Sequence, residues 1–229
     1  MERVTDPSGA PDRTWSCILF DLDGTIVDSA PGIISRMKTT LANVGAIVPS
    51  DADLLKWVGP PILESFRDFA GMNPEQSLVA LAEYRSQVAT EGAEAGTAVF
   101  PGVAGVLSRI AEAGIPLALA TSKPESQANV ILDHFGLSQY FTVICGASED
   151  ETRSRKADVV AEAVRRLTEQ GVDLSRPVLV GDRHHDVLGA AEHGIPTILV
   201  EWGYGSPAEA EGALAVVHST DALSSLLLG

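Results

Sequence analysis

The chain has 229 residues, of which 45% are hydrophobic, and 31 acidic residues against 16 basic ones give it a formal charge of −15. A chain of this length can bury a sizeable core, as one α/β domain or as a domain with an insertion. The negative charge excludes nucleic acid and anionic membrane surfaces as partners, but a small anionic substrate stays compatible because distant charges are screened beyond ~8 Å.

Residues 1–14 are rich in Pro, Gly, Ser and Asp and have no apolar stretch, which is typical of a loose leader and not of a signal sequence. No apolar run approaches the ~20 residues that a membrane-spanning helix needs. We therefore expect a cytoplasmic protein with no membrane partner. Cys17 and Cys145 both lie in apolar, strand-like runs, which predicts buried free thiols rather than a disulfide or a metal site.

The first predicted element is a short apolar strand over 17–20, which ends in the segment Asp21-Leu22-Asp23-Gly24-Thr25. Helical patterns follow without a strong strand among them, over 32–44, 51–58, 62–70 and 74–90. The stretch 91–97, rich in Gly, Ala and Glu, is the expected linker out of this helical region.

From Pro101 onward, helices and strands alternate. Helices are predicted over 103–113, 125–135, 157–170 and 186–193 and from 221, and strands over 116–121, 142–146, 178–182, 197–200 and 215–218. Short apolar strands that alternate with amphipathic helices predict the α/β class, with a parallel sheet covered on both faces. We expect a core domain of 15–28 and 98–229, interrupted by an all-helical cap domain over 29–97.

Residues that can carry chemistry follow the predicted strands. Asp21 and Asp23 stand two apart in an extended segment, so they point the same way and can converge on one reacting group and one metal ion. Spacing alone leaves open that they only cap the next helix. Ligands of open α/β sheets bind beyond the carboxyl ends of the strands. The same candidate site therefore includes the polar residues near the other strand ends: Thr121, Ser122, Lys156, Asp182 and Asp186.

These residue types are the set that phosphoryl transfer through an aspartyl-phosphate requires. A carboxylate can attack phosphorus, while a cation and hydrogen-bond donors neutralise the transferring group. Mg²⁺ prefers oxygen ligands and keeps several waters, so a few carboxylates are sufficient to hold it. A second carboxylate can protonate the leaving oxygen and then take a proton from the hydrolytic water.

The ordered set from Asp21 to Asp186 resembles the motifs of a haloacid dehalogenase superfamily phosphatase with an inserted helical cap. The resemblance implies a Rossmann-like core and a bound Mg²⁺ ion. It implies that Asp21 is the nucleophile and a metal ligand. It also implies that Asp23 is the general acid/base and gives a main-chain carbonyl to the metal. Asp182 would complete the metal site, and Asp186 would support that site without being a ligand.

The same resemblance assigns phosphate binding to Thr121 and to the amide of Ser122, with Lys156 neutralising the phosphoryl group and orienting Asp21. Lys123 is the alternative lysine, but Lys156 is favoured because it lies between the second and the last motif. Ser122 also begins a Ser-Lys-Pro-Glu capping box, so we expect its side chain to cap the following helix. Asp186 could likewise cap its own helix.

Two further patterns point away from other functions. His184 and His185 are adjacent, so they would point in different directions, and a pair in a surface loop is expected rather than a metal site. The segment Gly203-Tyr204-Gly205 is too short for a dinucleotide-binding fingerprint.

The substrate depends on the cap, where Trp57, Gly59 and Pro60 in a stiff turn are the candidates for substrate contacts, although an ordinary helix connection would look the same. The dehalogenases of this superfamily lack the second carboxylate of the motif, so Asp23 favours phosphoryl chemistry. Segments 120–124, 131–137 and 181–189 resemble the phosphoglycolate phosphatase branch. We therefore expect a Mg²⁺-dependent phosphatase of a small phosphorylated metabolite, as a monomer or homodimer. The alternatives are a 5′-nucleotidase, a sugar phosphomutase and, outside enzymes, a phosphate-responsive binding protein.

Overall fold

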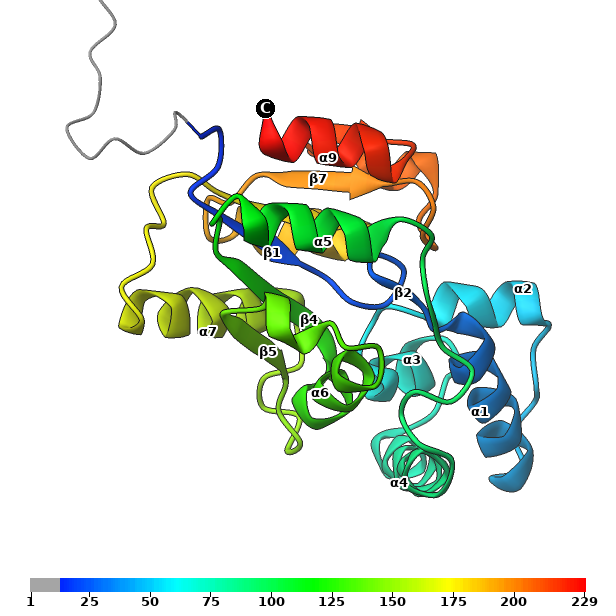
Figure 1. Ribbon diagram of the computed structural model, residues 1–229. Coiled ribbons are helices and arrows are strands. Elements are labelled where there is room, and N and C mark those ends of the chain that lie inside the picture. Colours follow the sequence, from blue (N-terminus) through cyan, green and yellow to red (C-terminus); the bar gives the residue numbers. More distant parts are fainter. Residues whose placement is uncertain (1–12) are drawn as a thin grey trace, which may run out of the picture.

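A computed structural model describes residues 13–229, and its centre is a six-stranded parallel sheet in the order β5-β4-β1-β6-β7-β8 (Figure 1). The strands are β1 (Cys17–Phe20), β4 (Leu117–Pro124), β5 (Val143–Ala147), β6 (Pro177–Gly181), β7 (Thr197–Val200) and β8 (Ala215–Val217). In the centre, Phe20 of β1 pairs with Leu119 of β4 on one side and with Val180 of β6 on the other. The three strands that precede the predicted acidic and hydroxyl residues are therefore neighbours.

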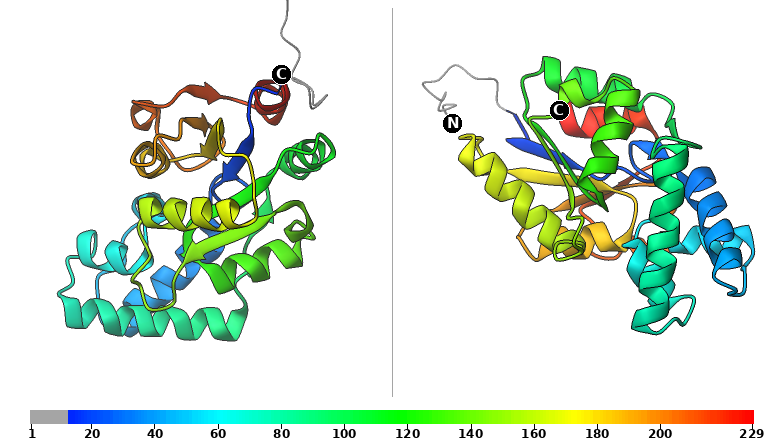
Figure 2. Two further views of the ribbon diagram at one scale, coloured as in Figure 1. Left: turned by 90° about the vertical axis from the view of Figure 1, so that its left-hand side faces the viewer. Right: turned by 90° about the horizontal axis from the view of Figure 1, so that it is seen from below.

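Helices cover both faces of the sheet (Figures 1 and 2). One face carries α5 (Val103–Glu112), α6 (Glu125–His134) and α9 (Thr220–Leu228), and the other carries α7 (Lys156–Glu169) and α8 (His184–Ala191). Successive residues of β1 serve the two cores in turn, since Ile18 and Phe20 pack with the first set and Cys17 and Leu19 with the second. Burial on both faces explains why this strand is a continuous apolar run.

A helical unit lies beside the sheet, at the lower right of Figure 1. It consists of α1 (Ala30–Asn43), α2 (Asp51–Leu54), α3 (Ile62–Asp68) and α4 (Pro74–Glu91), with a 3₁₀ turn over Leu55–Trp57. Its interior contains Met37, Leu41 and Phe66, which are fully buried. The predicted α/β class with an all-helical insertion is confirmed.

A two-stranded antiparallel ribbon joins the helical unit to the sheet. The chain leaves the core through β2 (Val27–Asp28) and returns through β3 (Ala98–Val99), with Asp28 opposite Ala98. The sequence does not predict these strands, because two residues are too few to show a strand period.

The expected capping role of the Ser122 side chain is wrong. β4 continues to Pro124, which pairs with Ala147 of β5, and α6 begins only at Glu125 without a side-chain cap. The Glu125 carboxylate instead accepts a hydrogen bond from the Gly146 amide at 3.2 Å. Strand pairing thus extends through the segment that the capping pattern assigns to a helix start.

Other expectations concern the start of the chain, the thiols and the membrane. The predicted leader, residues 1–14, lies outside the described residues except for Arg13 and Thr14. Cys17 and Cys145 are buried and free, as predicted. Among residues 13–229, none of the helices combines the length and apolar character needed to cross a bilayer.

Candidate active site

The predicted site residues meet at the carboxyl ends of the three central strands. Asp21 directly follows β1, Asp182 directly follows β6, and Thr121 lies in β4 where the pairing with β5 becomes irregular. All three side chains are buried. The parallel order β4-β1-β6 brings them together from positions up to 161 residues apart in the sequence.

Lys156, the first residue of α7, reaches into this group. Its Nζ lies 2.7 Å from Asp21 Oδ1 and 2.7 Å from Asp186 Oδ1, and it donates to the Ala120 carbonyl at 2.9 Å. The lysine stem passes Gly189, where a Cβ would lie 2.6 Å from Lys156 Cγ. Lys156 is therefore the lysine that contacts Asp21.

Asp21, Asp182 and Asp186 form the acidic centre. Burial has the largest effect on the pKa values of Asp21 and Asp182. It raises the pKa of Asp21 to about 6, although the Lys156 charge acts in the opposite direction. Burial, together with the charges of Asp186 and Asp21, also raises the pKa of Asp182 well above its usual range. For Lys156, burial lowers the pKa, but the two neighbouring carboxylates outweigh it and hold the pKa above its ordinary value. Three carboxyl groups thus share this centre with one ammonium group, which contacts only two of them, so the centre has an excess of negative charge.

The same three carboxyl groups fit a hard divalent cation. One oxygen from each of Asp21, Asp182 and Asp186 lies within 4.8 Å of the others. Asp182 Oδ2 accepts the Tyr204 amide at 2.6 Å, whereas its Oδ1 is buried and has no hydrogen-bond partner among residues 13–229. Gly24 has φ +84°, and a Cβ there would lie 2.2 Å from Asp182 Oδ2. An all-oxygen donor set with an unused buried oxygen suits Mg²⁺.

Asp186 does two things at once. As the third residue of α8, it accepts the amides of Asp182 and Arg183 at 3.1 and 3.0 Å through Oδ2, so it does cap its helix. Its other oxygen faces Lys156. The capping interpretation and the supporting role beside the metal site are therefore compatible.

Asp23 lies in different surroundings from Asp21. Its Oδ1 accepts the Ser29 hydroxyl at 2.5 Å, and Lys123 Nζ lies 3.0 Å from Oδ2 and 3.2 Å from Oδ1. The Asp23 and Lys123 side chains are only 9% and 7% exposed. Lys123 was expected to be an alternative to Lys156, but the two lysines contact different aspartates. Ser29 was not predicted.

The turn that contains Trp57, Gly59 and Pro60, here called the cap turn, faces this site. Trp57, Gly59 and Pro60 line a cavity of about 50 Å³ that Asp23 and Lys123 also line. Ser122 is a further wall residue of this cavity. A second cavity of about 170 Å³ lies between the Gly59-Pro60 segment and Lys156. The turn is thus placed where it can contact a substrate bound at the strand ends.

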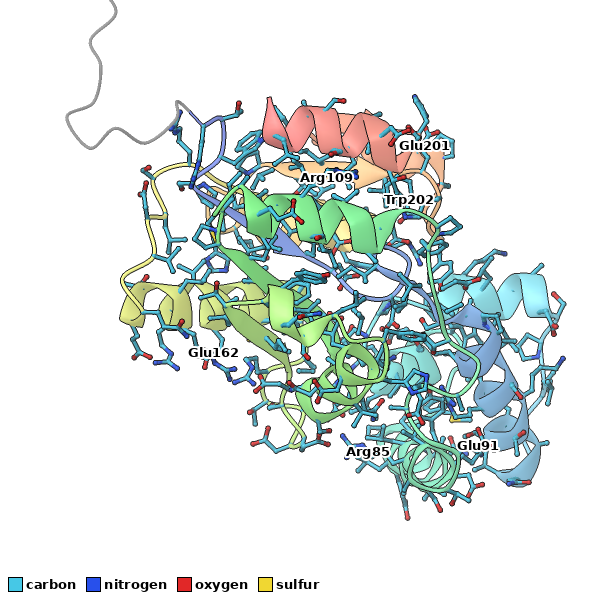
Figure 3. The ribbon with its side chains drawn as sticks, viewed as in Figure 1. Arg85, Glu91, Arg109, Glu162, Glu201 and Trp202 are labelled. Carbon is cyan, nitrogen blue, oxygen red and sulfur yellow. The ribbon has the colours of Figure 1, made fainter. Side chains whose placement is uncertain are left out.

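Two arginines connect the helical unit to the core. Arg183, next to Asp182, donates through Nη1 to the Val58 carbonyl at 2.6 Å and through Nε to Glu209 at 2.8 Å. Arg85 of α4 lies 2.6 Å from Glu151 in the loop after β5 (Figure 3). Neither contact was predicted, because nothing in the local sequence indicates pairing over such separations.

His184 and His185 differ from the expected surface-loop pair. They begin α8 and are partly buried, and their ring centroids lie 3.8 Å apart. His184 Nδ1 contacts Glu209 at 2.9 Å. Neither residue belongs to the group of potential metal ligands found in the described part of the chain.

The chain is similar to proteins with several names. It is 43% identical over 199 residues to the tyrosine-protein kinase PtkA of Mycobacterium tuberculosis, an alignment that covers 86% of this chain and 66% of that protein, which is just under two thirds of its length. A 5′-nucleotidase of Pseudomonas aeruginosa is 34% identical, with 84% and 85% of the two chains covered. A phosphoglycolate phosphatase of Caulobacter vibrioides is also 34% identical, with 91% and 89% covered.

A solved structure and a protein family also match this chain. The crystal structure of a predicted phosphatase from Clostridium acetobutylicum superposes with a TM-score of 0.86 at 36% identity, over 93% of this chain and 97% of that one. Residues 18–200 match the family described as haloacid dehalogenase-like hydrolase. The buried acidic centre lies within that match. We conclude that the chain belongs to the haloacid dehalogenase-like hydrolase family.

Proposed function

We propose that this protein is a Mg²⁺-dependent phosphomonoester hydrolase that acts on a small phosphorylated metabolite through an aspartyl-phosphate. One observation carries the proposal: two aspartates two residues apart have separate partners. Asp21 faces Lys156 and two further carboxyl groups, while Asp23 is held by Ser29 and Lys123. Different surroundings allow two carboxyl groups to take different roles in one reaction.

In the first step, an Asp21 carboxylate oxygen forms a bond to phosphorus as the bond between phosphorus and the ester oxygen breaks. The leaving oxygen takes its proton from Asp23. Lys156 holds Asp21 in orientation and neutralises the phosphoryl oxygens, which the Thr121 hydroxyl and the Ser122 amide also bind.

In the second step, a water oxygen forms a bond to phosphorus, and the bond to Asp21 breaks. Asp23, now ionised, takes a proton from that water, so the enzyme returns to its starting state and releases inorganic phosphate. Asp21, Asp182 and the main-chain carbonyl of Asp23 would hold Mg²⁺, with Asp186 supporting them. When bound, the ion offsets the negative charge that accumulates on the phosphoryl oxygens and carboxylates.

Residues 29–97 would act as a cap domain on a core of 15–28 and 98–229, closing over the substrate and excluding water. Trp57, Gly59 and Pro60 would contact the leaving group, since they line the cavity at Asp23. That cavity measures about 50 Å³, and the adjoining one between the same turn and Lys156 measures about 170 Å³, so both together bound the space for the leaving group.

The proposal is tested by phosphate release with Mg²⁺ across phosphoglycolate, nucleoside monophosphates and sugar phosphates. Wild type should turn over repeatedly on at least one monoester, and Asp21→Asn should lower the rate by at least about 10³-fold, since it removes the nucleophile. Asp182→Ala should be equally inactive. Asp133→Asn, the same change at an exposed position on α6, is the matched control. Substantial activity in folded Asp21→Asn would contradict the mechanism, and hexose phosphate isomerisation alone would favour a mutase.

The 43% identity to a protein named tyrosine-protein kinase favours a second candidate, in which a tyrosine hydroxyl replaces water as the acceptor. Incubating the protein with a phosphoryl donor and a tyrosine-containing peptide separates the two. We expect inorganic phosphate as the product, and phosphopeptide in excess of free phosphate would support the kinase. Absence of turnover with every donor would support the phosphate-responsive binding protein.

A further inference from the structure

Tyr204 is held against the acidic centre by its own backbone. It stands in the segment Gly203-Tyr204-Gly205 after β7, and its amide donates to Asp182 Oδ2 at 2.6 Å. A Cβ on Gly203 would lie 2.4 Å from the same oxygen, and one on Gly205 would lie 2.0 Å from the Asp182 carbonyl oxygen. The two glycines therefore permit an approach that fixes the point from which the Tyr204 side chain extends.

The Tyr204 hydroxyl reaches the segment that enters the cap. It accepts the backbone amides of Ser29 and Ala30 at 2.7 and 3.0 Å, and it donates to Asp28 Oδ1 at 2.9 Å. Ser29 is the N-cap residue of α1, and Ala30 is its first helical residue. The phenol thus accepts amides at the N-terminus of α1, across 174 residues of sequence.

Ser29 does not cap its own helix. A serine at an N-cap usually accepts an amide of the first helical turn through its hydroxyl. Here the Ser29 side chain makes no such bond, and its hydroxyl donates to Asp23 Oδ1 at 2.5 Å instead. Pro31 has no amide hydrogen, and the Gly32 amide donates to the Gly96 carbonyl at 3.2 Å, so neither needs the Ser29 hydroxyl. Tyr204 accepts the amides of Ser29 and Ala30, which holds the backbone that carries this hydroxyl.

We propose that Tyr204 is a positioning residue for the general acid/base: by accepting the amides of Ser29 and Ala30, it fixes the backbone from which the Ser29 hydroxyl holds Asp23. This inference rests on the proposed role of Asp23. Without the phenol oxygen, the amides of Ser29 and Ala30 lose an acceptor, and the segment that carries the Ser29 hydroxyl is no longer fixed. Asp23 then loses the hydrogen bond that sets its orientation.

The consequence depends on the leaving group of the substrate. An alkyl phosphate needs a proton on its departing oxygen, whereas p-nitrophenolate is stable enough to leave without one. The parameter kcat/KM reports only the steps up to transfer of the phosphoryl group to Asp21, so the later use of Asp23 as a base does not enter it. A misplaced Asp23 therefore slows alkyl substrates selectively.

The experiment measures kcat/KM of Tyr204→Phe on the best alkyl phosphate of the substrate panel and on p-nitrophenyl phosphate. This variant keeps the amide that contacts Asp182. We expect a loss of about 10- to 100-fold on the alkyl phosphate and less than about threefold on the aryl phosphate. Ser29→Ala should show the same pattern, and the double variant should be no worse than the stronger single one. Tyr140→Phe, the same change in the distant turn Ser138–Tyr140, should leave both values unchanged.

Hydrogen exchange of the metal-free protein gives a readout that does not depend on activity. Tyr204→Phe should speed exchange in a peptide covering residues 26–33 and leave the six-stranded sheet protected. Equal losses on both substrates, no loss on either, or unchanged exchange at 26–33 would overturn the inference. Since wild type must first hydrolyse both substrates, failure of the proposed function would be visible separately.

Discussion

Asp21 and Asp23 differ in what surrounds them, although they come from the same strand end. The Asp21 carboxylate shares Lys156 with Asp186 and lies close to Asp182, so burial and like charge both act on it. Asp23 instead has its own buried lysine and a serine hydroxyl. The two aspartates thus contact different lysines, as the separate roles of nucleophile and acid in the proposed function require.

The raised pKa of Asp21 predicts how stability changes with pH. In the metal-free protein this pKa is about 6, against an ordinary value of 3.8. A carboxyl group whose pKa is raised by folding contributes stability that is present below its unfolded pKa and lost as the pH rises through its folded pKa. Without metal, the melting temperature should therefore lose a contribution between about pH 4 and pH 6. The stabilisation by Mg²⁺ should grow over the same range, because the ion binds deprotonated carboxylates. Thermal melts with and without Mg²⁺ measure both effects.

Asp182→Asn isolates the part of the pH dependence that comes from Asp182, whose pKa burial also raises. Burial lowers the pKa of His185 to about 4, so its titration changes stability in the opposite direction over the same pH range, and only a comparison between chains that share His185 removes it. The variant removes one of the three buried charges, so it should melt at a higher temperature than metal-free wild type at pH 7. It should also respond less to Mg²⁺. If the melting temperature of Asp182→Asn depended on pH as strongly as that of wild type, this account would be contradicted.

At the residue scale, the sequence best predicted the side chains that lie at the carboxyl ends of the strands. Asp21, Thr121 and Asp182 could be found because parallel strands bring their carboxyl ends to one edge. Ser29 and Tyr204 could not be found, because their contacts span the chain and depend on where the cap segment meets the turn after β7. Lys123 was recognised as a candidate, but only the folded arrangement pairs it with Asp23.

At the element scale, the joint between β6 and α8 combines several contacts in a few residues. Asp182 belongs to the acidic centre, Arg183 contacts the Val58 carbonyl of the cap turn, and Asp186 caps the helix. Arg183 and His184 both donate to Glu209. Although burial alone would raise it, these hydrogen bonds lower the pKa of Glu209 to about 2. The cap turn is therefore fixed to the same joint that carries Asp182.

Arg183→Met tests this connection. The variant leaves the Val58 carbonyl and the buried part of Glu209 without the guanidinium, so residues 55–62 should exchange amide hydrogens faster. KM should rise more than kcat falls, because in the proposed function the turn contacts the leaving group and not the reacting phosphoryl group. Arg165→Met, which removes an arginine from exposed ion pairs on α7, is the matched control. Unchanged exchange at 55–62 would show that the arginine does not hold the turn.

The elements with a clear hydrophobic period were predicted within a few residues, as for α7 and β7. The failures occurred where tertiary pairing overrides local pattern. β4 runs on past Ser122 because β5, after an irregular stretch, pairs with it again at Pro124. The two-residue strands β2 and β3 exist only because they lie against each other. Local sequence carries no signal for either event.

For the whole molecule, Arg85 and Arg183 provide two connections between the helical unit and the core. Glu151, the partner of Arg85, has φ +61°, an uncommon conformation for a residue with a side chain. If the cap is held closed by these contacts, the double variant Arg85→Met/Arg183→Met should be more open in solution. We expect a larger radius of gyration by small-angle X-ray scattering than for wild type, with Arg165→Met unchanged. An identical scattering profile would mean that the remaining interface is sufficient to keep the cap closed.

The β2–β3 ribbon has a consequence for how caps can be exchanged. Asp28 and Ala98 are direct partners, so the two ends of the helical insertion lie side by side, and a short hairpin turn could join them. The residue that begins the insertion is Ser29, whose hydroxyl holds Asp23. A chain that gains, loses or swaps its helical insertion at this ribbon would therefore also replace the partner of Asp23, the proposed general acid. Under the proposed function, transplanting a cap between relatives would thus change the catalytic apparatus as well as specificity.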